Sequence, residues 1–236
     1  MEFRIPQWVS RYAVALSVVG LLWSAASAQQ AAAPTVRFTL DFPASDPMHY
    51  EISLLADGHG SYSSQSRSGT DAGLSSDPAH DAIEHYQTEF TASPSTAVRI
   101  FELARQANYF EGDVASSRKH MAFMGDKTLS YQAPGKSTHA TYNYSSLPEV
   151  QQLTEIFQGL AASLEFGRRL DHDLRYQKLA LEDELKRMED MVNEGHLQEL
   201  LPVAPILQKI VDDPAIIKVS RSRAQRLLAK AGAGGK

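Results

Sequence analysis

The chain has 236 residues, contains no cysteine and carries a formal net charge of −5. Without cysteine, disulfide frameworks, thiol catalysis and thiolate metal sites are excluded. The charge is unevenly spread, because seven basic residues stand against two acidic ones from Lys209 onward. We expect the basic end to dock on the acidic remainder of the chain or to meet an anionic partner.

The first segment has the pattern of an export signal. A basic start is followed by an apolar run from Ala13 to Trp23 and by small residues at 26–28, which is the order that signal peptides show. We expect cleavage near Ala28 and a mature protein that is periplasmic or secreted. Retention of the run as an N-terminal anchor is the alternative, although about 20 apolar residues are needed to span a bilayer.

Alternation of apolar and polar residues predicts six strands in the mature chain, because successive side chains of a strand point to opposite faces. Turn residues join two pairs of them as hairpins: Asp57-Gly58 in the first, and Pro134-Gly135 in the second. The strands are therefore predicted to form an antiparallel sheet. Their predicted ranges are 35–42, 49–56, 60–66, 84–92, 127–132 and 137–144.

Two helices, 94–108 and 148–164, are predicted to cover one face of this sheet. Each begins with a proline, which the first helical position tolerates, and each carries apolar residues at helical spacing. Gly167 is expected to end the second helix. The predicted fold class is α+β, an antiparallel sheet with two packed helices plus a helical C-terminal extension.

The predicted extension contains three helices, at 168–193, about 196–212 and 214–231. Leucines and other apolar residues form a seam along the first of them. Such a seam packs on the protein's own core or pairs with a second chain, so a homo-oligomer through 168–193 is one expectation.

The predicted elements divide the chain into a folded α+β part and a helical part, with flanking segments. A short Ala/Gln spacer is expected to precede the first strand, and a glycine-rich tail to follow the last helix. The expected divisions are a signal peptide (1–28), a spacer (29–34), an α+β domain (35–166), a helical extension (167–231) and a disordered tail (232–236).

One short stretch offers metal-ligating side chains. His80, Glu84 and His85 lie within six residues, and a metal-dependent hydrolase would use them first. The spacing is unfavourable, because histidines five positions apart on a helix diverge by about 140°, whereas a zinc-binding helix needs them one turn apart. A solvated loop is the simpler interpretation, as it is for the serine-rich tract at 67–82, which lacks the turn motif of a catalytic serine.

The last predicted helix is basic and amphipathic. Such a helix can lie on an anionic membrane surface or bind an envelope polyanion. Docking of the helix on the acidic body of the same chain is the alternative. The candidate contact residues are Lys218, Arg221, Arg223, Arg226 and Lys230.

One set of positions combines a proline-tyrosine strand, an Asp-Gly hairpin and a helix that ends in two aromatic residues. The set consists of Pro47, Tyr50, Ile52, Leu54, Asp57-Gly58, Tyr62, Phe101, Leu103, Tyr109-Phe110 and Asp126-Lys127-Thr128. It resembles a small bacterial exported α+β domain family of unknown function, over about residues 35–164. Members often carry a cysteine just before the proline, where this chain has Asp46. The resemblance implies export and an α+β fold, and no catalytic residues.

The sequence as a whole predicts an exported protein, a non-enzymatic binding or envelope-associated module whose partner is a protein or an envelope polyanion. A histidine-dependent or metal-dependent hydrolase is one alternative. A structural protein that self-associates through 168–193 is another. No catalytic residue, cofactor or nucleic-acid partner is predicted.

Overall fold

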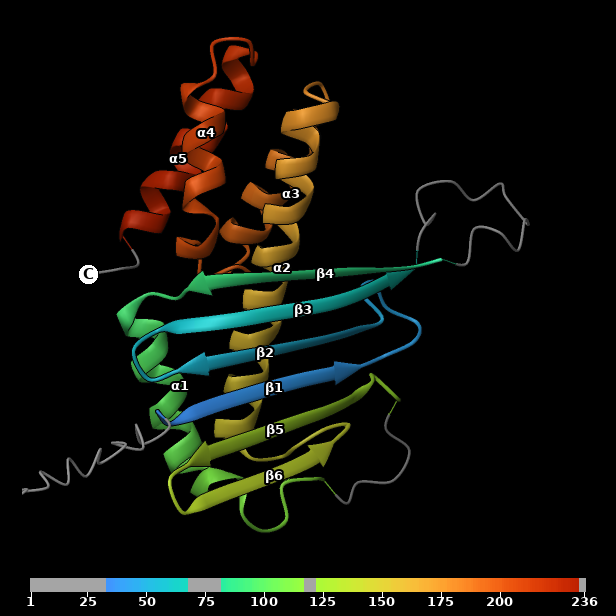
Figure 1. Ribbon diagram of the computed structural model, residues 1–236, viewed down its shortest axis with the longest axis vertical. Coiled ribbons are helices and arrows are strands. Elements are labelled where there is room, and N and C mark those ends of the chain that lie inside the picture. The colour runs from blue at the N-terminus through green and yellow to red at the C-terminus, as the bar shows by residue number, and fades with distance from the viewer. Residues whose placement is uncertain (1–32, 68–81, 117–121, 234–236) are drawn as a thin grey trace, which may run out of the picture. The chain divides into compact units, whose positions relative to one another are not determined.

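The computed structural model describes residues 33–67, 82–116 and 122–233. It contains a six-stranded antiparallel sheet in the order β4-β3-β2-β1-β5-β6, with helices α1 and α2 on one face (Figure 1). The α+β class predicted from the sequence is therefore confirmed. The predicted signal peptide, the spacer up to residue 32 and most of the serine-rich tract lie outside the described residues.

All neighbouring strands pair antiparallel, and β1 lies between β2 and β5 at the centre of the sheet. The six predicted strands are confirmed, with ends that differ by two residues at most. The strands are β1 (Thr35–Asp41), β2 (His49–Leu55), β3 (His59–Arg67), β4 (Ile83–Thr91), β5 (Asp126–Ala133) and β6 (Lys136–Tyr142).

The helix-covered face of the sheet holds the first core. Phe38 of β1 is fully buried and lies in register with Ile52 of β2 and Leu129 of β5, which are buried as well. The Phe38 ring stacks on Phe157 of α2, with ring centroids 5.3 Å apart and planes 2° from parallel. Apolar side chains from every second position of the strands thus pack against apolar side chains spaced three or four positions apart on the helices. Together they form one apolar layer.

Helix α1 (Pro94–Gln106) begins as predicted, because the Ser93 side chain accepts a hydrogen bond from the Thr96 backbone N–H. Helix α2 is longer than predicted and runs from Pro148 to Tyr176 without a break at Gly167. The predicted helix 168–193 is wrong in its bounds: its first part belongs to α2, and its second part is α3 (Leu181–Asn193).

The C-terminal elements also differ from the prediction in where they begin. Helix α4 starts at Ala204, after the short 3₁₀ turn η3, instead of near 196. Helix α5 starts at Lys218 instead of 214, because the Asp213 side chain accepts a hydrogen bond from Ala215 N–H and holds a turn there. The remaining elements are η2 (Asn108–Phe110), η3 (Leu201–Val203), α4 (Ala204–Asp212) and α5 (Lys218–Ala233).

A second apolar core lies among α2, α3, α4 and α5. The C-terminal part of α2 contributes Phe166 and Leu170 to it, whereas the part up to Leu164 packs against the sheet. The leucine seam that suggested self-association is largely used here, since Leu170, Leu181 and Leu185 are buried within the chain. Helix α2 therefore belongs to both cores.

Two glycines let another segment cross α2 at close range. A Cβ added at Gly159 would lie 2.8 Å from the carbonyl oxygen of His196, and one added at Gly167 would lie 2.9 Å from Val203 Cγ1. Glycine inside a helix costs about 1 kcal/mol relative to alanine. The burial of the crossing segment on α2 outweighs this cost, which explains why Gly167 does not end the helix.

We predict that Gly159→Ala lowers the free energy of unfolding by about 1–3 kcal/mol, because the added methyl group overpacks the contact with a backbone carbonyl. The matched control is Gly232→Ala in α5, where an added Cβ would meet nothing within 4 Å apart from its chain neighbours and the backbone of its own helix. Urea unfolding followed by circular dichroism measures both variants. An equal or higher unfolding midpoint for Gly159→Ala than for the parent chain would contradict the close approach.

Candidate functional site

A large charged cleft lies where the ends of β3 and β4 meet helices α2 and α3. Its volume is about 910 Å³. The sheet contributes Arg67 and Glu84 to its lining, α2 contributes Arg168 and Arg169, and α3 contributes Arg187. The cleft thus brings together charged side chains that lie far apart in the sequence.

The first buried anchor of the cleft is Glu165 of α2, which is only 4% exposed. Its Oε1 accepts hydrogen bonds from the Tyr62 hydroxyl at 2.8 Å and from Ser64 Oγ at 2.7 Å. Its Oε2 accepts one from Arg168 Nε at 2.8 Å. Tyr62 and Ser64 are two positions apart on β3 and so point to the same face. Glu165 therefore fixes Arg168 relative to the sheet.

Arg168 is further constrained from the strand side. Its Nη1 lies 3.7 Å from Glu84 Oε2, and its guanidinium lies 5.9 Å from the centre of the Tyr86 ring. Burial lowers the pKa of Arg168, but the hydrogen bond to Glu165 and the nearby carboxylates of Glu165 and Glu84 raise it more, so the net shift is upward. Arg168 is thus a permanent cation held in one orientation.

The second buried anchor is Glu184 of α3, which is 1% exposed. Its Oε1 accepts a hydrogen bond from Arg169 Nε at 2.5 Å, and its Oε2 accepts one from Arg187 Nη2. One carboxylate therefore joins α2 to α3 and orients two guanidinium groups at the cleft. Charge-assisted bonds of this kind are short and directional.

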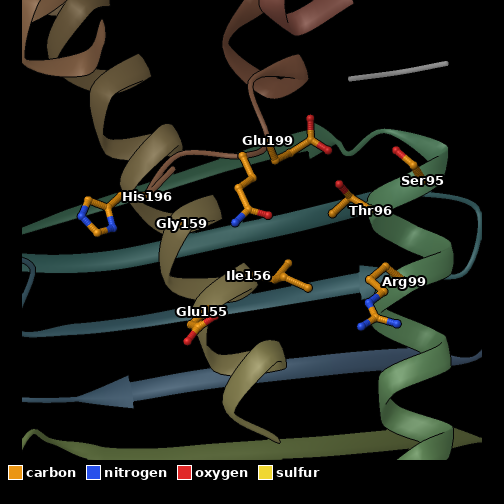
Figure 2. A pocket seen from close by; sticks show the side chains of 9 residues that line it. Ser95, Thr96, Arg99, Glu155, Ile156, Gly159, His196 and Glu199 are labelled. Carbon is orange, nitrogen blue, oxygen red and sulfur yellow. The ribbon is translucent and has the colours of Figure 1, made fainter. Parts of the chain in front are cut away.

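A smaller pocket of about 250 Å³ lies between α1, α2 and the segment that leads to η3 (Figure 2). Its buried carboxylate, Glu199, accepts hydrogen bonds from Ser93 N–H at 3.0 Å and Ser93 Oγ at 2.6 Å, and its other oxygen accepts one from Leu201 N–H at 2.9 Å. Glu199 is therefore occupied in joining this segment to the start of α1. Arg99 is the permanent cation of the pocket, and His196 also lines it.

Lys127 of β5 is the buried cation of a third pocket. Its Nζ donates to the carbonyl oxygens of Met124 at 3.0 Å, Gly125 at 3.3 Å and Asn143 at 3.0 Å. Burial lowers the pKa of Lys127, and Asp126 opposes this shift. All three ammonium protons are used by backbone carbonyls, so Lys127 closes the ends of β5 and β6 instead of offering a free amine.

The structure describes two of the three predicted metal candidates. His80 lies outside the described residues, Glu84 pairs with Arg168, and His85 is exposed on β4 opposite Gln65. Within 33–67, 82–116 and 122–233, no three histidine or acidic side chains are placed to hold a metal ion.

Three of the five predicted basic contact residues bind α3. Arg223 pairs with Glu182 at 2.8 Å and with Glu189 at 2.5 Å, Arg226 pairs with Glu189 at 2.7 Å, and Lys230 donates to Asn193 Oδ1 at 2.7 Å. The hydrogen bond from Arg226 is the main cause of a lowered pKa at Glu189. The basic helix thus docks on an acidic helix of its own chain. Lys218 and Arg221 lie in the first turn of α5.

No helix in the described part of the chain is long and apolar enough to cross a membrane.

Sequence reasoning missed the two buried glutamates and the arginines that they hold. A signal was present for Glu184, because it falls between Leu181 and Leu185 on the buried face of α3, where an apolar residue is expected. Glu165 likewise follows Ala161 by one helical turn on the buried side of α2. An acidic residue on an apolar stripe indicates a buried partner of opposite charge.

The fold and the cleft define an α+β protein with a helical extension and a charged cleft at their junction. No family model matches the chain, and no curated protein matches it either.

We predict that Tyr62→Phe lowers the free energy of unfolding by about 1–3 kcal/mol, because it removes one donor from a buried carboxylate. The control is Tyr176→Phe, since Tyr176 is 73% exposed. Urea unfolding at neutral pH measures both. Equal losses in the two variants would show that the bond to Glu165 does not contribute.

We also predict a loss of stability at alkaline pH. Burial raises the pKa of Tyr50, Tyr62 and Tyr142, and at Tyr62 the neighbouring Glu165 raises it further. The unfolded chain ionises these groups near pH 10. Their contribution is therefore full below about pH 10 and falls as the pH rises, by about 1.4 kcal/mol per pH unit for each tyrosine.

Unfolding midpoints measured from about pH 9 to about pH 11 test this dependence. The decline should be shallower in Tyr62→Phe than in the parent chain, by the contribution of one tyrosine. The same slope in both chains would contradict the raised pKa of Tyr62.

Proposed function

We propose that the mature chain is an exported, non-catalytic binding module that works at the cell envelope and holds its ligand in the charged cleft. The observation that supports this most is the pair of buried glutamates, Glu165 and Glu184, which orient three arginines at a cleft of about 910 Å³. The export pattern at the N-terminus and the resemblance to an exported family support the location.

The energetics of the anchors favour a binding role. Removing a carboxylate from water costs several kcal/mol, and a buried ion pair is commonly no more stabilising than a well-packed apolar pair. Two such carboxylates at one cleft are therefore poorly explained by stability alone. Binding sites use this arrangement, since groups that touch a ligand must be held in place by a supporting shell of hydrogen bonds.

The arginine cleft is a better candidate than the basic tail for contact with a partner. Arg223 and Arg226 already neutralise Glu182 and Glu189. A polyanion would have to displace these internal partners, and the acidic side chains would then be left to repel it. The side chains of Arg169 and Arg187 are 41% and 69% exposed, so a partner can reach them from solvent.

The test is co-sedimentation of the purified mature chain with insoluble peptidoglycan and with envelope membranes of the source cell. We predict binding that is lost in the double variant Arg169→Gln, Arg187→Gln and kept in the matched double variant Lys218→Gln, Arg221→Gln. Loss in the second variant alone would assign contact to the tail instead. Turnover of ester, peptide or glycoside substrates by the parent chain would refute the non-catalytic assignment.

A further inference from the structure

The arrangement of the arginines indicates which chemical group the cleft takes. We infer that Arg169 and Arg187, supported by Arg168, bind a single oxyanion, a carboxylate or phosphate group of a compact ligand. This inference rests on the proposed binding role of the cleft and specifies the ligand.

Two guanidinium groups converge from different helices. Arg169 of α2 and Arg187 of α3 hold opposite oxygens of the same carboxylate, Glu184. Each guanidinium has five N–H donors in a rigid plane, and each of these two places one of them on Glu184. The fork geometry of the remaining donors matches the oxygens of a carboxylate or phosphate.

The charges around Glu184 favour an anion. Arg169, Arg187 and Glu184 together carry a local charge of +1, although the described lining of the whole cleft holds five arginines and six carboxylates. The side chains of these arginines are 41% and 69% exposed, so a ligand can reach their outer edges. Arg168 adds a third guanidinium on the same cleft, already balanced by Glu165.

Arg187 is not needed to join the helices. The bond between Arg169 and Glu184 already links α2 to α3, whereas Arg187 and Glu184 are three residues apart on α3 itself. The position of Arg187 is therefore better explained by what it presents to the cleft than by stability.

The other acidic residues of the cleft limit the size of the ligand. Asp171 is paired with Arg175 at 2.6 Å, and Asp173 lies 3.3 Å from His172 Nδ1. Asp46 and Asp183 line the cleft as well. An extended polyanion would run along these carboxylates and be repelled by them, whereas one oxyanion on a compact ligand contacts Arg169 and Arg187 without spanning the cleft.

The experiment titrates the folded mature chain with inorganic phosphate and, separately, with succinate, at constant ionic strength set with chloride. The arginine Nε–H signals in nitrogen-15 NMR spectra report the site directly. We expect saturable shifts of a small group of these signals with one or both anions, and the stronger response identifies phosphate or carboxylate as the natural group. Chloride alone should produce no saturable shift.

Arg187→Gln should weaken the binding about tenfold or more, while its unfolding midpoint stays close to that of the parent chain. Arg187→Lys should recover only part of the affinity, because lysine keeps the charge and loses the planar fork. The matched control is Lys218→Gln, since Lys218 is exposed in the first turn of α5 and does not line the cleft. It should leave the anion affinity unchanged.

Two results would overturn the inference: no saturable shift with either anion, or unchanged affinity in Arg187→Gln. If the chain still sediments with the envelope material through the cleft arginines, the binding role stands and only the oxyanion assignment is wrong. If sedimentation is lost too, both are wrong.

Discussion

The close approach of the chain at 196–203 to helix α2 holds the two cores of this protein together. It depends on the missing side chains of Gly159 and Gly167, and it is fixed by a bond of 2.7 Å from Ser163 Oγ to the carbonyl oxygen of Glu199. The Glu199 side chain then accepts a hydrogen bond from Ser93, the N-cap residue of α1. A single segment thus contacts both helices that cover the sheet.

Buried glutamates mark the places where elements distant in sequence meet. Glu165 joins α2 to β3, Glu184 joins α3 to α2, and Glu199 joins the crossing segment to α1. Each carboxylate has its oxygens satisfied by hydroxyl, guanidinium or backbone donors, so the cost of burial is offset locally. At Glu165 and Glu184 the donors include arginines that border the cleft, so the contacts that join these elements also orient those arginines.

The charge split of the sequence has a structural meaning within the chain. The basic face of α5 neutralises the acidic face of α3, with Arg223 and Arg226 around Glu189. The net charge of the C-terminal segment therefore did not indicate how much of that charge is unpaired at the surface. Most of the arginines that border the cleft come instead from α2 and α3, where the sequence has acidic neighbours at nearly every arginine.

The sequence by itself determined the six strands, the cap of α1 and the α+β class, because alternation, capping and turn formation depend on neighbours only a few residues apart. It could not determine that α2 passes through Gly167, since this depends on Val203 filling the space beside it. Nor could it determine the cleft, because the partners of Glu165 on β3 are about 100 residues away. Only the tertiary structure brings such groups into hydrogen-bond contact, and the buried charges are stable only there.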